Sequence, residues 1–475
     1  MTLRRELRSS QFFTLAFGSV VGVGWVVVLG NWLEQAGPLG AAAAFAVGGV
    51  VMMFVGTCYA DMAHYFPVSG GEVAYTYGIY GIRTCFATGW FLALGYIVTA
   101  VFEAVSVLWI TSTLLPGIKG PVLYVIRGAP VHLGSLLLGI GGMVLITLLN
   151  LQGVKPTAEL QDWLTYTKIA LAALFISAGV ILGNVSNMLP PFGTGNSGNA
   201  WGGALAVFLT TPFWLSGFNT VSQVIGEKST HTSTATIGRM IVIAIGIAAL
   251  FYIFLIVACS MTMPWQQLVK LDLPAAAGFR VGLHSAYLAR VVLSVALLSN
   301  LTVWNATTLS GSQVLFALGR GHVIPNLFGK VNSKTGAPVS AILFVGILGI
   351  LGILVGSSVL LPVLNVAATC MAFAFALICI GVLVLRIKSA SHTTKLGWRD
   401  LFAPLIAVPV SITMLVLSFY EPYVSAGKAF PPEWGVFLGW SAIGVVFWLA
   451  AGKIRGSMTE DERRKIFLRS QAISK

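Results

Sequence analysis

Long apolar stretches separated by short polar segments run along almost the whole chain. Twelve of these stretches have about the length at which an α-helix crosses the hydrocarbon core of a bilayer. They predict helices at 12–35, 38–61, 85–113, 132–151, 159–183, 201–225, 238–262, 286–318, 338–358, 361–386, 401–420 and 434–452. The connections between them reach only roughly twenty residues. We therefore expect no separate water-soluble domain.

Composition supports a membrane location. Of the 475 residues, 57% are hydrophobic and only 9% are charged, whereas soluble domains carry about 25% charged residues. A chain with so few charges does not cover a water-facing surface. The predicted class is an all-α integral membrane protein with twelve transmembrane helices.

The net charge of +13 has an uneven distribution. If the N-terminus lies in the cytoplasm, 21 of the 28 lysines and arginines fall on the cytoplasmic face and six on the opposite face. This asymmetry is typical of the positive-inside rule, so the basic balance indicates topology and contact with anionic lipid, not a nucleic-acid partner. We expect a multi-pass protein of the plasma (cell) membrane with both termini cytoplasmic and no removable signal peptide.

Two of the predicted spans contain residues that interrupt helices. The first carries Gly22 and Gly24 within "FGSVVGVGWVVVLG" at 17–30, and the sixth carries Pro212 and Gly217 within "FLTTPFWLSGFNTVSQVIGE" at 208–227. A glycine costs a helix interior about 1 kcal/mol relative to alanine. Interrupted segments at matching positions of two inverted halves are typical of a transporter's binding site. The chain then divides into a first repeat (1–200), a second repeat (201–390), and two further helices with a basic tail (391–475).

Broken helices at membrane depth predict a binding site. Unpaired backbone groups are tolerated there only where they line a cavity or face a ligand. The N-terminus of a half-helix suits a carboxylate, and exposed carbonyls suit an ammonium group or a cation. We expect the substrate to contact backbone groups at six positions: Gly22, Val23, Gly24, Ser216, Gly217 and Phe218. The alternative for the first span alone is that Gly18 and Gly22 form a seam for close helix packing.

One stretch carries a resemblance to a known family. Residues 59–90 read "YADMAHYFPVSGGEVAYTYGIYGIRTCFATGW", and this strongly resembles the end of the second span and the following loop in the amino acid–polyamine–organocation superfamily of permeases. The matching positions are Tyr59, Ala60, Asp61, Pro67, Ser69, Gly70, Gly71, Tyr75, Tyr77, Gly89 and Trp90. The two interrupted segments and "FALGRGHVIPNLFGKVN" at 316–332 also resemble that family.

The resemblance implies a leucine-transporter-like fold, with a five-plus-five inverted repeat, broken helices one and six, and two extra helices. It implies secondary transport of amino acids or amines, with Phe213 closing over the bound ligand. There are departures from the family pattern: Asn219 stands where many relatives carry Asp or Glu, and Gln313 where many carry Arg. We expect Asn219 to be one of the substrate-binding residues, but without an acidic group it argues against a second strong cation site.

Lys168, within the predicted fifth span, is a candidate for proton coupling. A charge at the bilayer centre costs roughly 3 kcal/mol or more, so an intramembrane lysine indicates function, and a buried ammonium group can release its proton. The resemblance implies that such a lysine points at the broken first helix and fills the volume of the sodium site of sodium-coupled relatives. The alternative is a lysine nearer the cytoplasmic end that snorkels to the headgroups.

Glu103 is the only acidic residue deep in a predicted span. Its position about five turns along the third span predicts the outer half, where it either lines a vestibule and attracts a cationic group or pairs within the protein. Asn300, Trp304, Asn305 and Thr307 give the eighth span a polar stripe that forms either a pocket wall or contacts between helices. Glu227 is a candidate for a gate or a salt bridge.

The remaining signals predict neither catalysis nor a bound cofactor. Five cysteines without metal-site spacing are interpreted as packing residues, the six histidines are scattered, and no nucleophile–base arrangement is present. We therefore expect a proton-coupled importer of an amino acid or small amine that works by alternating access, with the proton as coupling ion and the bilayer and a small molecule as partners. The alternatives are an obligate exchanger and a transporter-like sensor or channel. Substrate identity and oligomeric state remain open.

Overall fold

The computed structural model describes residues 6–115, 117–195, 198–356, 360–390, 398–427 and 429–468. Within these residues nine helices are long and apolar enough to cross a bilayer, which confirms the all-α membrane class. They are α2 (Gly24–Tyr65), α4 (Ile82–Leu114), α5 (Leu133–Leu151), α6 (Val154–Leu182), α9 (Thr234–Thr262), α12 (Ala286–Arg320), α14 (Leu360–Ala390), α15 (Trp398–Ala426) and α16 (Pro432–Ala450).

Shorter helices complete the chain. Among the elements that matter below are α1 (Ser9–Val20), α3 (Gly71–Tyr80), α7 (Ala200–Trp214), α8 (Thr220–Val224), the 3-10 turn η3 (Ile225–Glu227), α13 (Val339–Ile353), α17 (Gly452–Ser457) and α18 (Glu460–Leu468). The connection between α9 and α12 contains α10 (Trp265–Leu268), α11 (Pro274–Ala277) and η4 (Gly278–Gly282). The other two turns are η1 (Val185–Met188) and η5 (Asn326–Gly329).

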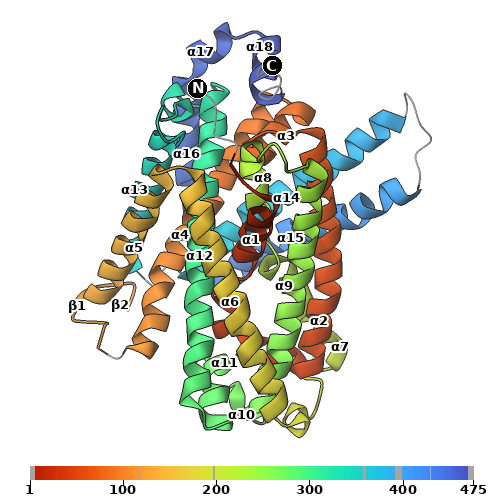
Figure 1. Ribbon diagram of the computed structural model, residues 1–475, viewed down its shortest axis with the longest axis vertical. Coiled ribbons are helices and arrows are strands. Elements are labelled where there is room, and N and C mark those ends of the chain that lie inside the picture. The colour runs from red at the N-terminus through yellow and green to blue at the C-terminus, as the bar shows by residue number, and fades with distance from the viewer. Residues whose placement is uncertain are drawn as a thin grey trace.

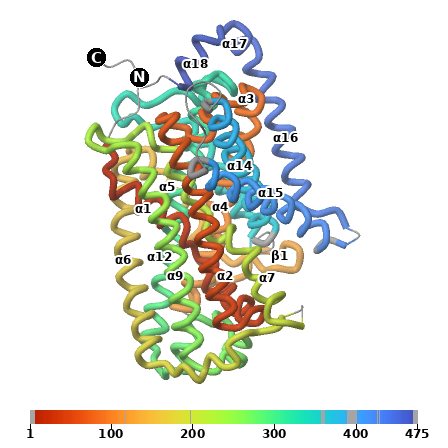
Figure 2. Tube along the Cα trace, turned by 90° about the vertical axis from the view of Figure 1, so that its right-hand side faces the viewer, coloured from red at the N-terminus to blue at the C-terminus, as the bar shows by residue number. Residues whose placement is uncertain are grey.

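The long helices form an elongated bundle (Figure 1). α3, α17 and α18 lie at one end, which we call the terminal face, and α10 and α11 lie at the opposite end (Figures 1 and 2). In the interior α2 packs against α9 and α7, and α12 packs against α4 and α6. The interrupted segments are therefore surrounded by long helices.

α2 is two helical segments that meet at a sharp bend. Gly37 has a φ of 69° inside this 42-residue element, and Pro38 follows it. A positive φ suits glycine, and proline has no amide hydrogen with which to continue the helix. The predicted stretches 12–35 and 38–61 thus correspond to α1 together with the two segments of α2.

Both expected interruptions are present. α1 ends at Val20 and α2 begins at Gly24, so residues 21–23 are not helical. α7 ends at Trp214 and α8 begins at Thr220, which leaves residues 215–219 outside the helices. The glycine positions in the sequence indicated both places.

A small hairpin departs from the expectation of helices alone. Strands β1 (Val122–Ile126) and β2 (Ala129–His132) pair antiparallel in the connection between α4 and α5. The two residues between them, Arg127 and Gly128, both have positive φ, the geometry of a tight hairpin turn. β1 is largely exposed, whereas Val131 of β2 is buried. The sequence pattern predicted no strands in this connection.

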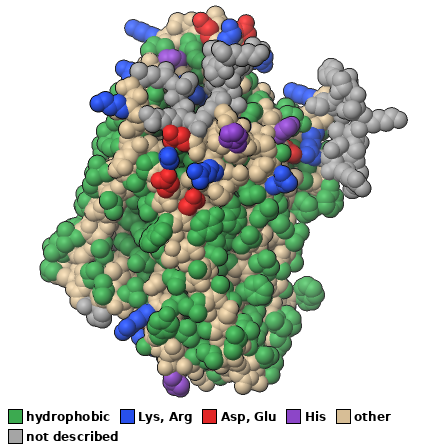
Figure 3. All heavy atoms as spheres, in the orientation of Figure 1, with side chains coloured by type: hydrophobic (Ala, Val, Ile, Leu, Met, Phe, Trp, Pro, Cys, Tyr) green, Lys and Arg blue, Asp and Glu red, His purple; other side chains and the backbone are tan. Residues whose placement is uncertain are grey.

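The surface of the bundle suits lipid. Large apolar side chains are exposed along the long helices, for example Leu145 on α5 at 68%, Ile181 on α6 at 77% and Leu449 on α16 at 68%. Charged side chains gather toward the terminal face, while hydrophobic atoms cover most of the rest of the visible side (Figure 3). A soluble monomer rarely exposes so large an apolar area. All five cysteines are buried and free, in agreement with a packing role.

Some of the basic residues behind the predicted charge asymmetry lie outside the described residues. These are Arg4, Arg5, Lys395, Lys428, Arg469 and Lys475.

Candidate functional site

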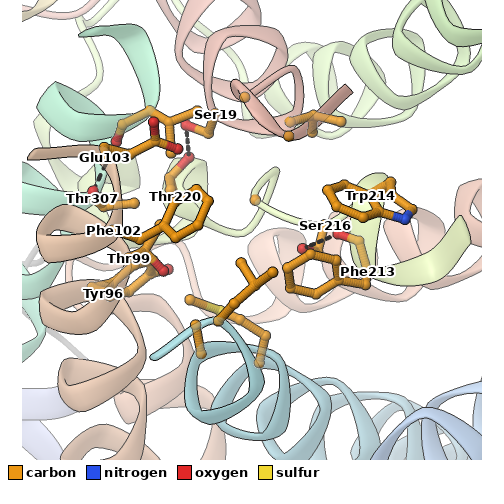
Figure 4. Close-up of a pocket in the computed structure, with 18 of the residues that line it drawn as sticks. Ser19, Tyr96, Thr99, Phe102, Glu103, Phe213, Trp214, Ser216, Thr220 and Thr307 are labelled. Carbon is orange, nitrogen blue, oxygen red and sulfur yellow. Dashed lines mark hydrogen bonds between the residues drawn. The ribbon is translucent and has the colours of Figure 1, made fainter. Parts of the chain in front are cut away.

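A cavity of about 90 Å³ lies where the two interrupted segments meet. Its wall includes the first break, the second break, and side chains of α4, α9, α12 and α14 (Figure 4). The lining residues are Ser19, Val20, Gly22, Gly24, Tyr96, Thr99, Phe102, Glu103, Phe213, Trp214, Ser216, Gly217, Thr220, Tyr252, Val303, Thr307, Leu364, Ala367 and Met371. Five predicted site residues of the breaks are among them: Gly22, Gly24, Phe213, Ser216 and Gly217.

The two breaks touch each other. Gly217 has a φ of +106°, and a Cβ atom placed there would lie 2.6 Å from the carbonyl oxygen of Ser19. The hydroxyl groups of Ser19 and Thr220 lie 3.1 Å apart and form a hydrogen bond between α1 and α8 (Figure 4). Only glycine permits both this backbone conformation and this close approach.

The start of α2 presents free hydrogen-bond donors beside the cavity. None of the described residues accepts a hydrogen bond from the amide of Gly24 or Trp25. The first amides of a helix carry partial positive charge and favour an anion. The arrangement therefore suits a carboxylate at the first break.

Glu103 on α4 lies in the wall of the cavity, beside the first break. Its side chain is 3% exposed, and its Oε1 atom lies 3.4 Å from where a Cβ atom of Gly22 would be. Its Oε2 atom has no hydrogen-bond partner among the described residues.

Lys168 on α6 contacts the end of α1. Its Nζ atom donates to the carbonyl of Val21 at 3.0 Å, to that of Gly18 at 3.4 Å, and to the Thr302 hydroxyl on α12 at 2.9 Å. The ammonium group also lies 5.4 Å from the centre of the Phe17 ring, a favourable cation–π position. The side chain is 1% exposed, so the headgroup-snorkelling alternative is wrong.

Aromatic rings cover the start of α2, next to the first break. A Cβ atom at Gly24 would lie 2.3 Å from the Trp214 ring, and Trp214 packs edge-on against Phe213 and Trp32 with ring centres 4.9 and 5.4 Å away. Figure 4 shows Phe213 and Trp214 on the side of the cavity opposite Glu103. Phe213 was expected to cover the ligand, and Trp214 beside it lies against Gly24 at the start of α2.

Three predicted site residues do not line the cavity. Val23 is buried, and Phe218 is fully buried, with its ring stacked on Phe375 at 5.4 Å. Asn219 is also fully buried and donates to Glu72 and Tyr96. The chain turns at Gly217, which has a positive φ, and the side chains of the next two residues pack inside the protein, whereas Thr220 again lines the cavity.

The remaining sequence candidates divide between wall and packing. Thr307 lines the cavity, whereas Asn300 donates to the backbone carbonyl of Glu103 at 2.9 Å and Asn305 donates to Gln161 at 2.9 Å. Trp304 packs against α5 at Gly142. The eighth-span stripe thus provides both pocket wall and interhelical hydrogen bonds.

Backbone hydrogen bonds join the segment before α1 to the end of span six on the terminal-face side. The amides of Glu6 and Leu7 donate to the Glu227 carbonyl at 2.9 and 3.0 Å, and the Ser229 amide donates to the Leu7 carbonyl at 2.8 Å. The Glu227 carboxylate accepts from Gln313 at 2.8 Å. This segment therefore ties the start of α1 to the end of span six.

Sequence reasoning missed part of the wall. Tyr96, Thr99, Leu364 and Met371 line the cavity from α4 and α14. They are ordinary residues of apolar helices, and no local pattern distinguishes them from lipid-facing or packing positions. Only the arrangement of the helices brings them to the breaks.

Comparison with known proteins is consistent with this geometry. A family model described as amino acid permease matches residues 7–449. The chain is 26% identical over 462 residues to the methylthioribose transporter of Bacillus subtilis (strain 168), with 95% of this chain and 94% of that protein covered. It is 28% identical over 407 residues to the branched-chain amino acid permease BcaP of the same organism (82% of each chain). It is 26% identical over 352 residues to the amino-acid permease RocE, also of that organism (72% and 71%).

Proposed function

Since the chain belongs to the amino acid permease family, we propose that it is a proton-coupled importer of an amino acid or small amine that works by alternating access. One observation carries this proposal: both interrupted segments line the same cavity. Paired broken helices of this kind are typical of a secondary transporter's substrate site.

The cavity suits a small zwitterion. The free amides at the start of α2 favour the carboxylate, and the carboxyl group of Glu103 in the cavity wall favours the ammonium group. A dry cavity of about 150 Å³ admits benzene, so the volume of about 90 Å³ holds a ligand of only a few heavy atoms unless Trp214 or Met371 moves. Small amino acids are therefore preferred over long ones. The relatives include both a branched-chain amino acid permease and a methylthioribose transporter, so the cavity is the stronger guide to the substrate.

The helices support a finer topology. If α1 with the first segment of α2 is the first crossing, and α7 with α8 is the sixth, the elements fit twelve crossings arranged as a five-plus-five inverted repeat with two further helices. The charged groups gathered toward the terminal face (Figure 3) support a cytoplasmic location for that face and for both termini. The closed contacts at Glu227 then represent a state with its cytoplasmic side shut.

Lys168 supports the coupling assignment. It is a buried ammonium group that binds the carbonyl end of α1, and loss of its proton would weaken those hydrogen bonds directly. A proton released there changes how firmly α1 is held. The same contacts support the use of a proton in place of sodium, because the Nζ atom occupies the space beside the α1 carbonyls.

A ligand screen followed by transport in vesicles tests the proposal. Purified protein is heated with each of the standard amino acids and with small amines, since a ligand that binds only the folded state raises the melting temperature. The best ligands are then offered to protein-containing vesicles under an inward proton gradient. We expect accumulation under the gradient alone. Accumulation that requires substrate inside the vesicle indicates an exchanger, and ionic current without substrate indicates a channel.

Replacement of Glu103 by glutamine is expected to raise the Michaelis constant of the transported substrate roughly tenfold, because a charge-assisted hydrogen bond to a buried partner contributes more than about 1.4 kcal/mol. Uptake against substrate concentration measures it. Glu159→Gln removes one exposed carboxylate from α6 and serves as the charge-matched control. An unchanged Michaelis constant in Glu103→Gln excludes a contact between this carboxyl group and the substrate.

A further inference from the structure

The Ser-Gly-Gly loop before α3 packs directly on the terminal-face half of span six. A Cβ atom at Gly71 would lie 2.6 Å from the Cβ atom of Ser222, and one at Gly226 would lie 2.6 Å from the amide nitrogen of Ser69. The amide of Gly70 donates to the Gln223 carbonyl at 3.1 Å. Glycine allows this approach of backbone to backbone, and α3 and α8 therefore form one tight interface.

Glu72 joins the two elements within this interface. It lies in the first turn of α3 and is fully buried. Its Oε1 atom accepts a hydrogen bond from Asn219 Nδ2 at 3.1 Å, and its Oε2 atom accepts one from Gln223 Nε2. Asn219 directly precedes α8 and Gln223 lies four residues later, within it. One carboxyl group therefore binds two successive turns of this short helix.

The same network reaches the substrate cavity. Asn219 Nδ2 also donates to the Tyr96 hydroxyl at 2.9 Å, and Tyr96 lines the cavity, as does Thr220, the residue after Asn219. Glu72 is thus two hydrogen bonds from the cavity wall. Position 219 is an asparagine in this chain, and the acidic group in contact with it comes from α3.

The observed arrangement suits the ionised carboxylate, because both oxygens accept from amide N–H groups. A protonated carboxyl must instead donate one hydrogen bond. Acceptors are at hand, since Asn219 Oδ1 and Gln223 Oε1 have no hydrogen-bond partner among the described residues. Rotation of the Gln223 amide would present its oxygen to the new O–H group, at the loss of the present N–H contact. The site can therefore hold the carboxyl group in either charge state.

The surroundings provide no strong opposite charge for the ionised form. The titratable side chains that interact with Glu72 or its neighbour Tyr59 from the adjacent elements are phenols and a thiol: Tyr59, Tyr75, Tyr96 and Cys379. α8 contributes the two amides, α14 also contributes the Met371 sulfur beside Asn219, and α12 contributes Ala317 against Gly70. α18 places its charged groups near Tyr77, farther along α3: Glu460, Arg463 and Arg464.

Glu72 belongs to a connecting helix and not to one of the nine long apolar helices of the described residues. Removal from water raises the pKa of its carboxyl group to about 7, although the hydrogen bonds from Asn219 and Gln223 lower it. Proton binding at this position therefore changes across the neutral range: the carboxyl is protonated at acidic pH and ionised at alkaline pH.

We propose that Glu72 is a proton-binding site that controls the attachment of α8 to α3, and thereby the opening of the cavity toward the terminal face. The ionised carboxylate holds both Asn219 and Gln223. When the carboxyl group binds a proton, only one of the two amides can still donate to it as it does now. The other hydrogen bond is lost, and α8 is then free to move with the end of span six. The proton comes from water at the terminal face and returns there, and no other covalent bond forms or breaks. The consequence for transport rests on the proposed function, whereas proton binding at Glu72 does not.

Infrared difference spectroscopy of the full chain in lipid vesicles tests the site directly. A protonated carboxyl group has its own carbonyl stretching band, and the acid-minus-alkaline difference spectrum reports which groups bind protons. We expect a band that titrates near neutral pH in the wild-type protein, that is lost in Glu72→Gln, and that persists in Glu433→Gln. Glu433 is also buried and bonds Asn365 on α14, far from α3 in sequence and outside this network.

A second variant separates proton binding from a merely structural contact. Gln223→Leu keeps the carboxyl group but removes a donor to its ionised form, so the midpoint of the band is expected to move to higher pH. A band that is unchanged in Glu72→Gln, or a midpoint that does not move in Gln223→Leu, overturns the proposal. In active vesicles Glu72→Gln is also expected to flatten the dependence of uptake on the pH at the terminal face. If the wild-type protein shows no uptake under any gradient while the spectroscopic results are as expected, the transport function is refuted and the proton-binding site at Glu72 is still supported.

Discussion

Replacement of Lys168 by alanine is expected to abolish accumulation of substrate under a proton gradient. The variant removes the ammonium group that joins α6 to the carbonyl end of α1 at Gly18 and Val21 and to Thr302 on α12 through charge-assisted hydrogen bonds. Such bonds to a buried ammonium group contribute about 1.5–3 kcal/mol each. Initial rates should fall by roughly tenfold or more, and the accumulated level should approach that of empty vesicles.

Two further variants decide whether the proton or the charge is required. Lys168→Arg keeps a positive charge that a protein does not deprotonate, so it should still exchange substrate in counterflow but no longer accumulate it. Lys155→Ala removes an exposed lysine near the start of the same helix and should leave uptake unchanged. Normal accumulation in both Lys168 variants refutes the coupling role.

Replacement of Gly217 by valine is expected to eliminate substrate binding. Position 217 has a φ of +106°, a conformation that costs an L-residue at least about 1–2 kcal/mol and is worst for a β-branched side chain. The new Cβ atom would also collide with the Ser19 carbonyl at 2.6 Å. The two breaks must then separate, and the ligand-induced rise in melting temperature should disappear.

The same substitution at Gly141 is the matched control. Gly141 lies in α5, and a Cβ atom there meets nothing within 4 Å, so Gly141→Val should fold and bind as the wild type does. The monodispersity of each purified variant shows whether it has folded. A folded Gly217→Val protein with wild-type affinity means that the contact between the breaks does not form the substrate site.

The sequence was sufficient for the features that depend on local composition. The apolar stretches identified the membrane class because bilayer thickness sets helix length. Gly22, Gly24 and Gly217 identified the interruptions because these residues weaken a helix wherever they occur. Lys168 was recognisable as a candidate functional residue because burying a charge within an apolar span costs free energy, and no neighbouring residue in the sequence offsets that cost.

The sequence alone misplaced residues whose role depends on which way the chain turns. Phe218 and Asn219 follow a glycine with positive φ, so their side chains leave the cavity, and the spacing from Gly217 does not reveal this turn. Trp214 is not among the predicted site residues, because only the approach of α7 to the start of α2 shows that its ring covers Gly24.

The sequence by itself determined that this is a membrane protein, approximately where its helices lie, and the two places where they break. Each of these features depends on residues that are close together in the sequence. The tertiary structure alone decided which helices surround the breaks, how deep Glu103 lies, and that Glu72 meets Asn219 across 147 positions of the chain. Those contacts depend on the packing of distant helices. The residues next to Glu72 in the sequence do not show that its carboxyl group is buried, because only the packing around α3 removes it from water.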